Sequence, residues 1–277
     1  MTPIVIVGGS GHLGSALHAR LPGAVATHHR CPSAGSIAFD FRTGGQLPET
    51  RTVIGAFPLA RLLQDSSPAE RAESVARYIA SLRGARLVQL STDAVFSGRQ
   101  GGRAEADAPD PLTPYGRAQA QVDELILASA PDSLIVRTSF IFGWAGGRLD
   151  KRLAPLVEEP ERLSHQVWPH DVYRSPTEVN FLAEGIARAV EQRLAGLLHV
   201  AGPRMSIAEF FASALAPLGF TQLPAPKSEE NPAVARDTSM VSTRMHGALG
   251  LDDTENWSWY PRFLPAALGG SPTDASA

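Results

Sequence analysis

The sequence contains one cysteine and very little lysine. Its single thiol, Cys31, excludes an internal disulfide and a cysteine-based metal cluster, and it has no recognisable partner for nucleophilic catalysis. Lysine occurs only as Lys151 and Lys227, so residues 1–150 contain none and arginine supplies most of the cations. We therefore expect no metal site and no lysine-dependent step within the first 150 residues.

Strong net charge and long apolar stretches are also lacking. The net charge of −3 favours neither nucleic acid nor an anionic membrane surface as a partner. No apolar run is long enough to span a bilayer, and the N-terminus has no basic region of the kind that opens a signal peptide. We expect a cytoplasmic protein that acts on a small-molecule substrate, and the sequence leaves a homodimer or a protein partner open.

A glycine-rich turn follows the first predicted strand. Residues 3–7 form a short apolar run that is typical of a buried parallel strand, and helical spacing continues from Ser15. The glycines between them follow the pattern G-x-x-G-x-x-G, which permits a tight turn and lets backbone N–H groups approach a pyrophosphate. A plain βα turn with glycine at its bends is the alternative. The predicted cofactor contacts in this turn are Gly8, Ser10, Gly11, His12, Leu13 and Gly14.

The end of the second predicted strand, residues 24–28, bears on the choice of cofactor. An acid there would bind a ribose 2′-hydroxyl, whereas a cation would bind a 2′-phosphate. His29 and Arg30 follow this strand, and no acid does. The pattern favours NADP(H) over NAD(H), with a solvated surface arginine as the alternative for Arg30.

Two further strand ends complete the predicted cofactor pocket. Asp40 and Phe41 end a short strand that begins at residue 37, and Asp40 is placed to accept a hydrogen bond from an adenine amino group. A turn or helix-capping aspartate is the alternative. Ala56 and Phe57 end the strand over residues 51–57, where the second half of the cofactor should pass.

Strands continue to alternate with helices, which predicts a doubly wound parallel α/β sheet of the Rossmann type. Further predicted strands cover residues 85–91, 133–143 and 196–202. Predicted helices cover residues 67–82, 115–127, 152–158 and 178–193, and Ser206 with Glu209 forms a capping box that opens another.

The looser segments predict a smaller α/β substrate lobe. Residues 1–143 form the dinucleotide-binding domain, and residues 177–202 return to it. Residues 144–176 and 203–265 form the lobe, which should lie over the carboxyl ends of the strands, where α/β sheets bind ligands. Residues 266–277 are predicted to form a flexible tail.

Two hydroxyl side chains, Thr92 and Tyr115, lie at a predicted strand end and at the start of a predicted helix. Beside a nicotinamide ring, such a pair is suited to donate a proton to a developing alkoxide. A catalytic tyrosine normally needs a cation to lower its pKa from about 10. One helical turn later, where that cation would lie on the same face, this chain has Gln119.

Several motifs occur in one order along nearly the whole chain. They are Gly8-x-x-Gly11-x-x-Gly14, the run from Ser91 to Gly98, Glu105-x-Asp107 with Pro109 and Pro111, Tyr115-Gly116-Arg117, Val136 to Ser139, Asp171 with Ser175 to Thr177, and Leu198 to Pro203. The chain thereby resembles the extended short-chain dehydrogenase/reductases, and most closely their dTDP-4-dehydrorhamnose reductase branch. The resemblance implies a ketone reductase that uses NAD(P)H and acts on a sugar nucleotide.

The resemblance also implies roles for single residues. Thr92 would polarise the substrate carbonyl and Tyr115 would be the general acid, with Asp93 beside them as a further catalytic candidate. Phe96 and Arg174 would contact the substrate, and Arg174 would meet a phosphate unless it is an ordinary surface arginine.

Two departures from the family pattern concern the chemistry. The family has lysine four residues after the tyrosine, and Gln119 stands there instead; glutamine can hydrogen-bond ribose hydroxyls but offers no charge. A tyrosine near its ordinary pKa would lose a factor of about 10²–10⁴ in the proton-transfer step. The family usually shows Asn-Ala-Ala where this chain has Gly55-Ala56-Phe57, and Phe57 is predicted to crowd the cavity near the nicotinamide.

Three functions follow from this pattern. The first is an NAD(P)-dependent oxidoreductase with an altered proton relay, acting on a sugar nucleotide or a specialised metabolite carbonyl. The second is a non-redox descendant that binds the dinucleotide and works through a partner protein, as the regulatory subunit of methionine adenosyltransferase does. The third is an enzyme with redirected acid/base chemistry that uses Thr92, Asp93 or a histidine.

Overall fold

Seven parallel strands form one sheet in the computed structural model of the chain, which describes residues 3–29, 32, 35–43 and 45–268. The spatial order is β12-β6-β5-β4-β1-β2-β3, and each neighbouring pair is parallel. The strands are β1 (Val5–Val7), β2 (Val25–His28), β3 (Ile37–Ala38), β4 (Thr52–Gly55), β5 (Arg86–Thr92), β6 (Leu134–Thr138) and β12 (Gly196–His199). The prediction of a doubly wound parallel sheet is confirmed.

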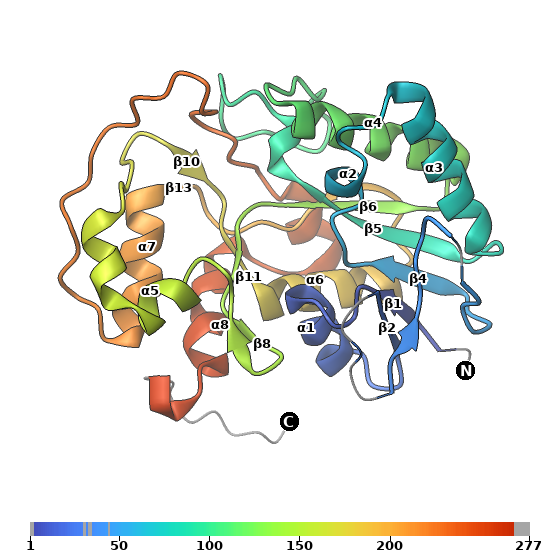
Figure 1. Ribbon diagram of the computed structural model, residues 1–277, viewed down its shortest axis with the longest axis horizontal. Coiled ribbons are helices and arrows are strands. Elements are labelled where there is room, and N and C mark those ends of the chain that lie inside the picture. The colour runs from blue at the N-terminus through green and yellow to red at the C-terminus, as the bar shows by residue number, and fades with distance from the viewer. Residues whose placement is uncertain (1–2, 30–31, 33–34, 44, 269–277) are drawn as a thin grey trace.

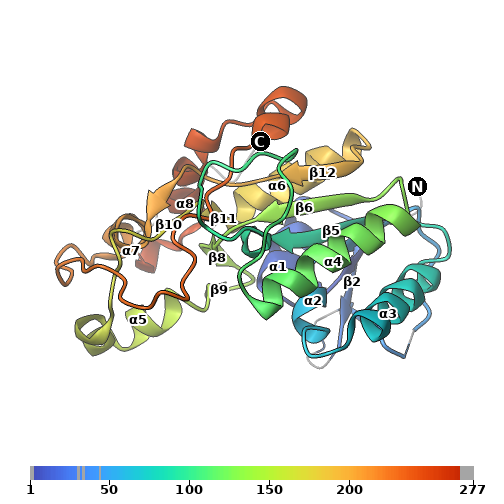
Figure 2. The same cartoon turned by 90° about the horizontal axis from the view of Figure 1, so that it is seen from above.

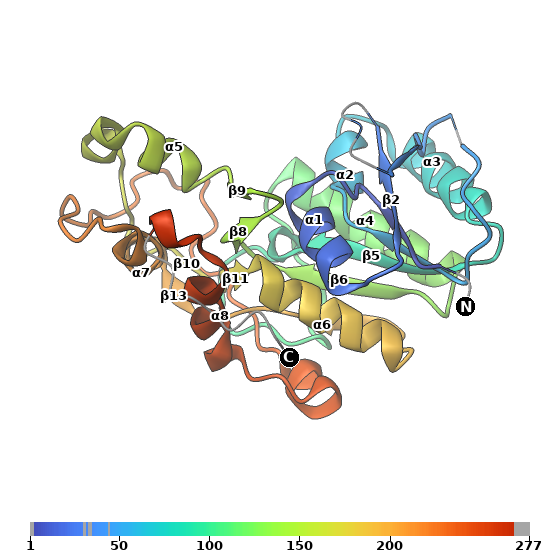
Figure 3. The ribbon, with the colours of Figure 1, turned by 90° about the horizontal axis from the view of Figure 1, so that it is seen from below.

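Helices cover both faces of this sheet (Figures 2 and 3). Because side chains alternate along a strand, Ile6, Ile54 and Val88 pack with α1 (His12–Arg20) and α6 (Val179–Glu191). The alternate residues of these strands pack with the helices of the opposite face, which are α2 (Leu59–Leu62), α3 (Pro68–Ser81) and α4 (Pro114–Ser129). Strands buried on both faces read as continuous apolar runs, which is why the sequence identified them.

The start of α4 is positioned by a close backbone approach. Thr113 caps the helix by accepting a hydrogen bond from the Gly116 backbone N–H at 3.0 Å. A Cβ at Gly116 would lie 2.1 Å from the Ala94 carbonyl oxygen, so only glycine lets the helix approach the short 3₁₀ helix η1 (Asp93–Val95) this closely. This contact places Tyr115 against the end of β5.

The strand predicted over residues 133–143 is in fact two strands. The chain leaves the main sheet after β6, and β7 (Ile141–Phe142) pairs instead with β11 (Thr177–Glu178). The two residues between the strands have other partners: the Ser139 hydroxyl donates to Asp93, and the Phe140 carbonyl accepts from the Thr177 N–H at 2.8 Å. The break therefore turns Ser139 toward the site rather than into the sheet.

The remaining elements form a smaller lobe at one end of the sheet (Figure 1). Its strands are β8 (Trp144–Ala145), β9 (Arg148–Leu149), β10 (Tyr173–Arg174) and β13 (Met205–Ser206). Its helices are α5 (Ala154–Glu158), η2 (Pro160–His165), α7 (Ile207–Leu215), η3 (Ala216–Leu218), η5 (Asp253–Glu255), α8 (Asn256–Phe263) and η6 (Ala266–Leu268). They enclose a separate apolar core that is rich in aromatic rings.

We propose the division into a dinucleotide-binding domain and a substrate lobe at the boundaries that the sequence predicts. One part of residues 203–265 packs elsewhere: in and after the π-helical turn η4 (Met245–Leu249), the residues Met245, Leu249 and Leu251 join the core beneath α6. Residues 269–277 of the predicted flexible tail lie outside the described residues. Within the part of the chain that the structure describes, no helix combines the length and apolarity needed to cross a membrane.

Glu178 is a buried acid that caps α6. Its side chain is 0% exposed and accepts hydrogen bonds from the backbone N–H groups of Asn180 at 2.7 Å and Phe181 at 2.8 Å. Burial is the largest influence and raises the pKa of Glu178 to about 7. The buried carboxylate therefore lowers the free energy of unfolding near neutral pH. This cost is absent in acid, where Glu178 is protonated.

We expect Glu178→Gln to remove a pH dependence of stability. Because the folded pKa of about 7 exceeds the unfolded value of 4.5, this group's contribution is complete below pH 4.5 and is lost as pH rises through 7. The free energy of unfolding of the wild type should fall by about 3 kcal/mol from this group between pH 4.5 and 8. Urea denaturation across that range would measure it, with Glu70→Gln as the control because Glu70 caps α3 at an exposed position. Equal pH slopes in wild type and Glu178→Gln would contradict the prediction.

Candidate functional site

The glycine-rich turn has the geometry of an anion-binding cradle. Gly8 has a φ of +83°, which glycine adopts without strain, and its N–H donates to Thr27 Oγ1 at 3.3 Å. Gly11 caps α1, which has no acid in its first turn. A Cβ at Gly14 would lie 2.2 Å from the Gly8 carbonyl oxygen, so α1 packs directly on the turn. A helix N-terminus this open and free of acids fits the pyrophosphate of a dinucleotide.

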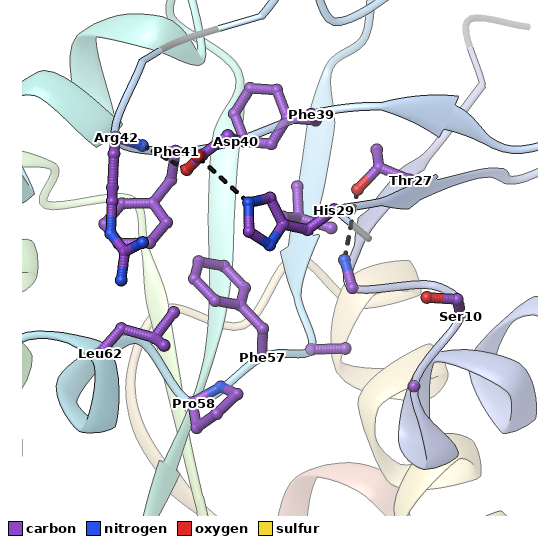
Figure 4. A pocket seen from close by; sticks show the side chains of 14 residues that line it. Ser10, Thr27, His29, Phe39, Asp40, Phe41, Arg42, Phe57, Pro58 and Leu62 are labelled. Atoms are coloured by element: carbon purple, nitrogen blue, oxygen red, sulfur yellow. Dashed lines mark hydrogen bonds and ion pairs between the residues drawn. The ribbon is translucent and has the colours of Figure 1, made fainter. Parts of the chain in front are cut away.

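Beside the turn lies a pocket of about 420 Å³, here called the adenosine pocket (Figure 4). The structure brings most of the predicted cofactor residues into its wall: Gly8, Ser10, Gly11, His29, Asp40, Phe41, Ala56 and Phe57. It adds residues that sequence reasoning missed, namely Val7, Thr27, Phe39, Arg42, Pro58 and Leu62. Arg30 lies outside the described residues.

Polar groups at the rim of the adenosine pocket contact the Asp40 carboxylate. His29 Nε2 lies 3.3 Å from Asp40 Oδ2, and the Arg42 N–H donates to Asp40 Oδ1 at 2.9 Å (Figure 4). The Arg42 guanidinium lies over the Phe41 ring, with 5.4 Å between its central carbon and the ring centroid. Arg42 was detectable from sequence only as a cation two residues after Asp40.

Phe57 lines the adenosine pocket and is absent from the wall of the pocket that Thr92 and Tyr115 line. Its ring lies 5.6 Å from that of Phe41 and 5.7 Å from that of buried Tyr78, in the wall of the adenosine pocket. The strand before it turns in this direction because the Gln89 amide donates to the carbonyls of Gly55 and Phe57. The aromatic cluster under α3 thus holds this ring away from the hydroxyl pair, and crowding at the nicotinamide stays a prediction.

A second pocket of about 350 Å³, here called the reaction pocket, adjoins the first through Ala56 and Pro58. Thr92 and Tyr115 both line it, and Thr92 is close enough to Tyr115 to influence the pKa of its phenol. The predicted contacts His12 and Leu13 line it as well. The other lining residues are Leu90, Ser91, Thr138, Ser139, Ile141, Asp150, Lys151 and Arg152.

Electrostatics keep both titratable rings of the reaction pocket in their neutral forms. Burial and the Asp93 carboxylate raise the pKa of Tyr115, and they outweigh the opposing influence of Thr92 and Arg61. Burial and the Arg148 cation lower the pKa of His12 to about 4. At neutral pH, Tyr115 can therefore donate a proton, whereas His12 carries no charge.

A third pocket of about 610 Å³, here called the substrate pocket, opens on the far side of the hydroxyl pair. Besides Pro58, it shares Thr92, Tyr115, Ser139, Lys151 and Arg152 with the reaction pocket. The predicted residues Asp93, Phe96 and Arg174 line it too. Sequence reasoning missed the rest, which are Pro58, Arg61, Ala94, Leu112, Thr113, Phe140, the segment 233–235 and Thr238.

Asp93 organises the floor of the substrate pocket. Its carboxylate accepts hydrogen bonds from Thr92 at 3.0 Å, Ser139 at 2.8 Å and Thr238 at 2.7 Å, and it lies 3.9 Å from Arg174 Nε. Arg174 is also engaged by the chain itself, because it donates to the Tyr173 and Ala235 carbonyls. Much of its hydrogen-bonding capacity is therefore used within the protein.

Gln119 lies in none of these three pocket walls. Its side chain is 2% exposed, and its amide donates to Asp123 Oδ1 at 2.8 Å. Asp123 is equally buried, accepts from Ser91 at 2.8 Å and pairs with Arg137 at 3.3 Å. The structure thus places Gln119 in a buried polar network rather than in a pocket wall.

Cations reach Tyr115 from other elements instead. The Arg61 guanidinium lies 5.6 Å from the centroid of the Tyr115 ring, at the end of α2. Lys151 and Arg152 follow β9 and line both the reaction and substrate pockets. Lys151 is one residue beyond the lysine-free segment, and no spacing rule relates it to Tyr115, so the sequence alone did not reveal it.

The chain is similar to proteins of known type. Residues 65–259 match the family described as RmlD substrate binding domain. The dTDP-4-dehydrorhamnose reductase of Salmonella typhimurium is 34% identical over 148 residues, which are 51% of this chain and 47% of that protein. Methionine adenosyltransferase 2 subunit beta of Danio rerio is 30% identical over 122 residues, 42% of this chain and 38% of that protein. The matches thus span about half or less of these curated relatives.

The fold is shared with solved structures. The dTDP-4-dehydrorhamnose reductase of Bacillus anthracis, solved in complex with NADP, superposes with a TM-score of 0.72 at 22% identity and covers 95% of this chain and 98% of its own. At this identity the likeness concerns the fold.

Proposed function

The chain belongs to the RmlD substrate binding domain family, and on that premise we propose that it is an NAD(P)-dependent oxidoreductase that reduces the carbonyl of a sugar nucleotide. The observation that carries the proposal is the continuity of the site. The glycine-rich turn, the adenosine pocket and the reaction pocket follow one another along the carboxyl ends of the strands, and Thr92 and Tyr115 line the reaction pocket together.

In this proposal the turn formed by Gly8, Gly11 and Gly14 holds the pyrophosphate, and Ala56 and Pro58 line the passage to the nicotinamide end. The bound cofactor supplies the hydride that converts the carbonyl carbon to an alcohol carbon. Tyr115 would donate the proton that the carbonyl oxygen needs as negative charge develops on it. The Thr92 hydroxyl, which donates to Asp93 in the structure, would turn from Asp93 to donate to the same oxygen.

The charges of the substrate pocket support a phosphorylated substrate. Arg61, Lys151 and Arg152 line this pocket together with Arg174, while Asp93 is its only acid within the described residues. Guanidinium and ammonium groups are the usual partners of phosphate oxygens. The diphosphate of a sugar nucleotide would meet these cations while its sugar approaches Thr92 and Tyr115.

NADP(H) is the cofactor we favour. His29 and Arg42 line the adenosine pocket, and no acid follows β2 directly. Asp40 is the group that would favour NAD(H), but its carboxylate is already held by His29 and by the Arg42 backbone. A 2′-phosphate would therefore meet a cation at this rim.

Titration with NADPH and NADH, followed by nicotinamide fluorescence and melting temperature, tests the proposal. We expect both cofactors to bind with a fluorescence change. Arg42→Ala should weaken the binding of NADPH about fivefold and leave the affinity for NADH within twofold, as for a partly exposed charge pair worth about 1 kcal/mol. Arg77→Ala is the control, since Arg77 is exposed on α3 and lies outside the pocket walls. Equal losses of affinity for the two cofactors would show that Arg42 does not contact the 2′-phosphate. Failure of both cofactors to bind would overturn the proposal.

One observation favours a second candidate, a dinucleotide-binding protein without hydride transfer that works through a partner. No lysine follows Tyr115 by one helical turn, and the pKa of Tyr115 is raised rather than lowered. The similarity to methionine adenosyltransferase 2 subunit beta is compatible with such a role. Tight NADPH binding combined with no oxidation of NADPH by dTDP-4-dehydrorhamnose or related keto sugars would favour this candidate.

A further inference from the structure

A second polar pocket lies at the opposite end of the sheet from the cofactor site. It measures about 590 Å³ and lies beside the amino ends of β4, β5 and β6. In the ribbon, these strand ends lie on the side of α3 rather than on that of the smaller lobe (Figure 2). Four arginines line it: Arg51, Arg83, Arg86 and Arg193. We refer to them as the amino-end arginine cluster.

Few acidic groups neutralise the positive charge of the amino-end arginine cluster. Asp132 is the one acid in the described wall of this pocket, so four positive charges face one negative charge and leave a net +3. Arg86 is buried and donates to the carbonyls of Asp132 and Leu194. The side chains of Arg51, Arg83 and Arg193 form no hydrogen bond or ion pair with any residue that the structure describes. Burial and nearby Arg193 lower the pKa of Arg86, and they outweigh the opposing influence of Asp132.

Two members of the cluster adopt a costly backbone conformation. Arg83 has a φ of +53° and Arg193 a φ of +54°, and they are the only described residues other than glycine with positive φ. Each follows the last turn of a helix, Arg83 after α3 and Arg193 after α6, where glycine is the usual residue. A cation favours a helix C-terminus, but the left-handed conformation disfavours arginine. Backbone strain of this kind is typical of functional sites, so its occurrence at two positions of one pocket favours a binding role for these two arginine side chains.

A buried hydroxyl in the same wall has no partner. Ser133 lines the pocket and is 1% exposed, and its Oγ forms no hydrogen bond within the described part of the chain. A buried hydroxyl without a partner is unfavourable, and a bound acceptor would relieve it. Guanidinium groups and a free hydroxyl are both donors, so the missing group is an acceptor with negative charge.

We propose that this pocket is a second anion site, distinct from the cofactor cradle, that binds a small molecule carrying two or more phosphate groups. A single carboxylate would leave most of the +3 charge unmatched, whereas one phosphate monoester brings about −2 and two linked phosphates match the cluster. The fork of each guanidinium suits phosphate oxygens in pairs. The inference does not depend on the reductase proposal, because the two sites lie at opposite ends of the strands.

The test uses inorganic pyrophosphate as the probe, titrated calorimetrically into the full-length protein at low ionic strength. We expect wild type to bind, with an affinity that falls as salt is added. The double variant Arg83→Gly/Arg193→Gly should bind at least about tenfold more weakly, because two charge-assisted contacts are lost. Its melting temperature should rise by about 2–4 °C, because glycine accepts positive φ without steric cost. A stabilised protein that has lost its ligand cannot be explained by damage to the fold.

Two further variants keep the result decisive. Arg83→Asn/Arg193→Asn should show the same loss of binding, since asparagine also tolerates positive φ, and it replaces the glycine variant if that one fails to fold. Arg77→Gln removes a charge from α3 outside the pocket and should bind like wild type. Pyrophosphate that fails to bind wild type would overturn the proposal. Undiminished binding to both double variants would do so as well, because it would place the anion elsewhere, for example at the glycine-rich turn.

Discussion

Tyr115→Phe should lower kcat for carbonyl reduction by about 10²–10⁴-fold while leaving NADPH affinity within about twofold. Among the described residues, Tyr115 has the one phenol that lines both the reaction and substrate pockets. Removing one hydroxyl leaves the ring, its contact with Arg61 and the pocket shape in place. The measurement is single-turnover oxidation of NADPH with a keto sugar nucleotide, with Tyr173→Phe as the control because Tyr173 lines neither pocket.

The pH dependence gives an independent check on Tyr115. Its pKa is raised from the ordinary value of 10, so the protonated acid needed for reduction persists across the neutral range. Reduction by wild type should therefore be flat between pH 6 and 9, and it should fall only as pH rises above that raised pKa. The reverse oxidation needs the phenolate, so its rate should increase about tenfold per pH unit in this range. If Tyr115→Phe keeps half of the wild-type rate of carbonyl reduction, another group donates the proton.

The cations near Tyr115 could not be predicted from the sequence. Spacing along a helix indicates that residue 119 follows Tyr115 by one turn, and the absence of lysine there is visible in the sequence. Spacing does not indicate that Arg61 from α2 lies against the ring, or that Lys151 and Arg152 enter from the loop after β9. These contacts depend on how α2 and the smaller lobe pack on the sheet, which no local pattern encodes.

The cofactor half of the site was accessible to prediction because its determinants are local. A β-branched strand, a glycine at positive φ and a helix start are consecutive in sequence, and Gly8 and Gly14 contact each other across only six residues. Asp40 was likewise placed by its strand end. The direction of Phe57 was not, because its ring is held by Tyr78 from α3, whose packing is a long-range contact.

The buried polar network that contains Gln119 leads to the second large effect. Arg137→Met should lower the free energy of unfolding by about 3–5 kcal/mol, because it strands the Asp123 carboxylate in the protein interior. Both side chains are almost fully buried, and Arg137 is the only cation paired with Asp123 among the described residues. For a chain of this size, the melting temperature should fall by about 10 °C. Denaturant unfolding of wild type and variant at pH 7 measures the effect directly.

The double variant Asp123→Asn/Arg137→Met separates charge from packing. Asparagine keeps one acceptor oxygen for Ser91, and its NH2 group can donate to the Gln119 amide oxygen once that amide turns over. Removing the charge should therefore recover most of the lost stability. A loss as large as in Arg137→Met would mean that the Arg137 packing against Phe96 matters more than the ion pair. Lowering the pH also separates the effect of the charge from that of packing, without a second mutation. Burial already raises the pKa of Asp123, and without Arg137 it should rise further, so protonation would neutralise the stranded carboxylate more readily. A group with a raised folded pKa favours the folded state at low pH and loses that advantage as pH rises. The gap between wild type and Arg137→Met should therefore narrow from pH 7 to pH 5, because in acid the variant no longer holds an unpaired charge.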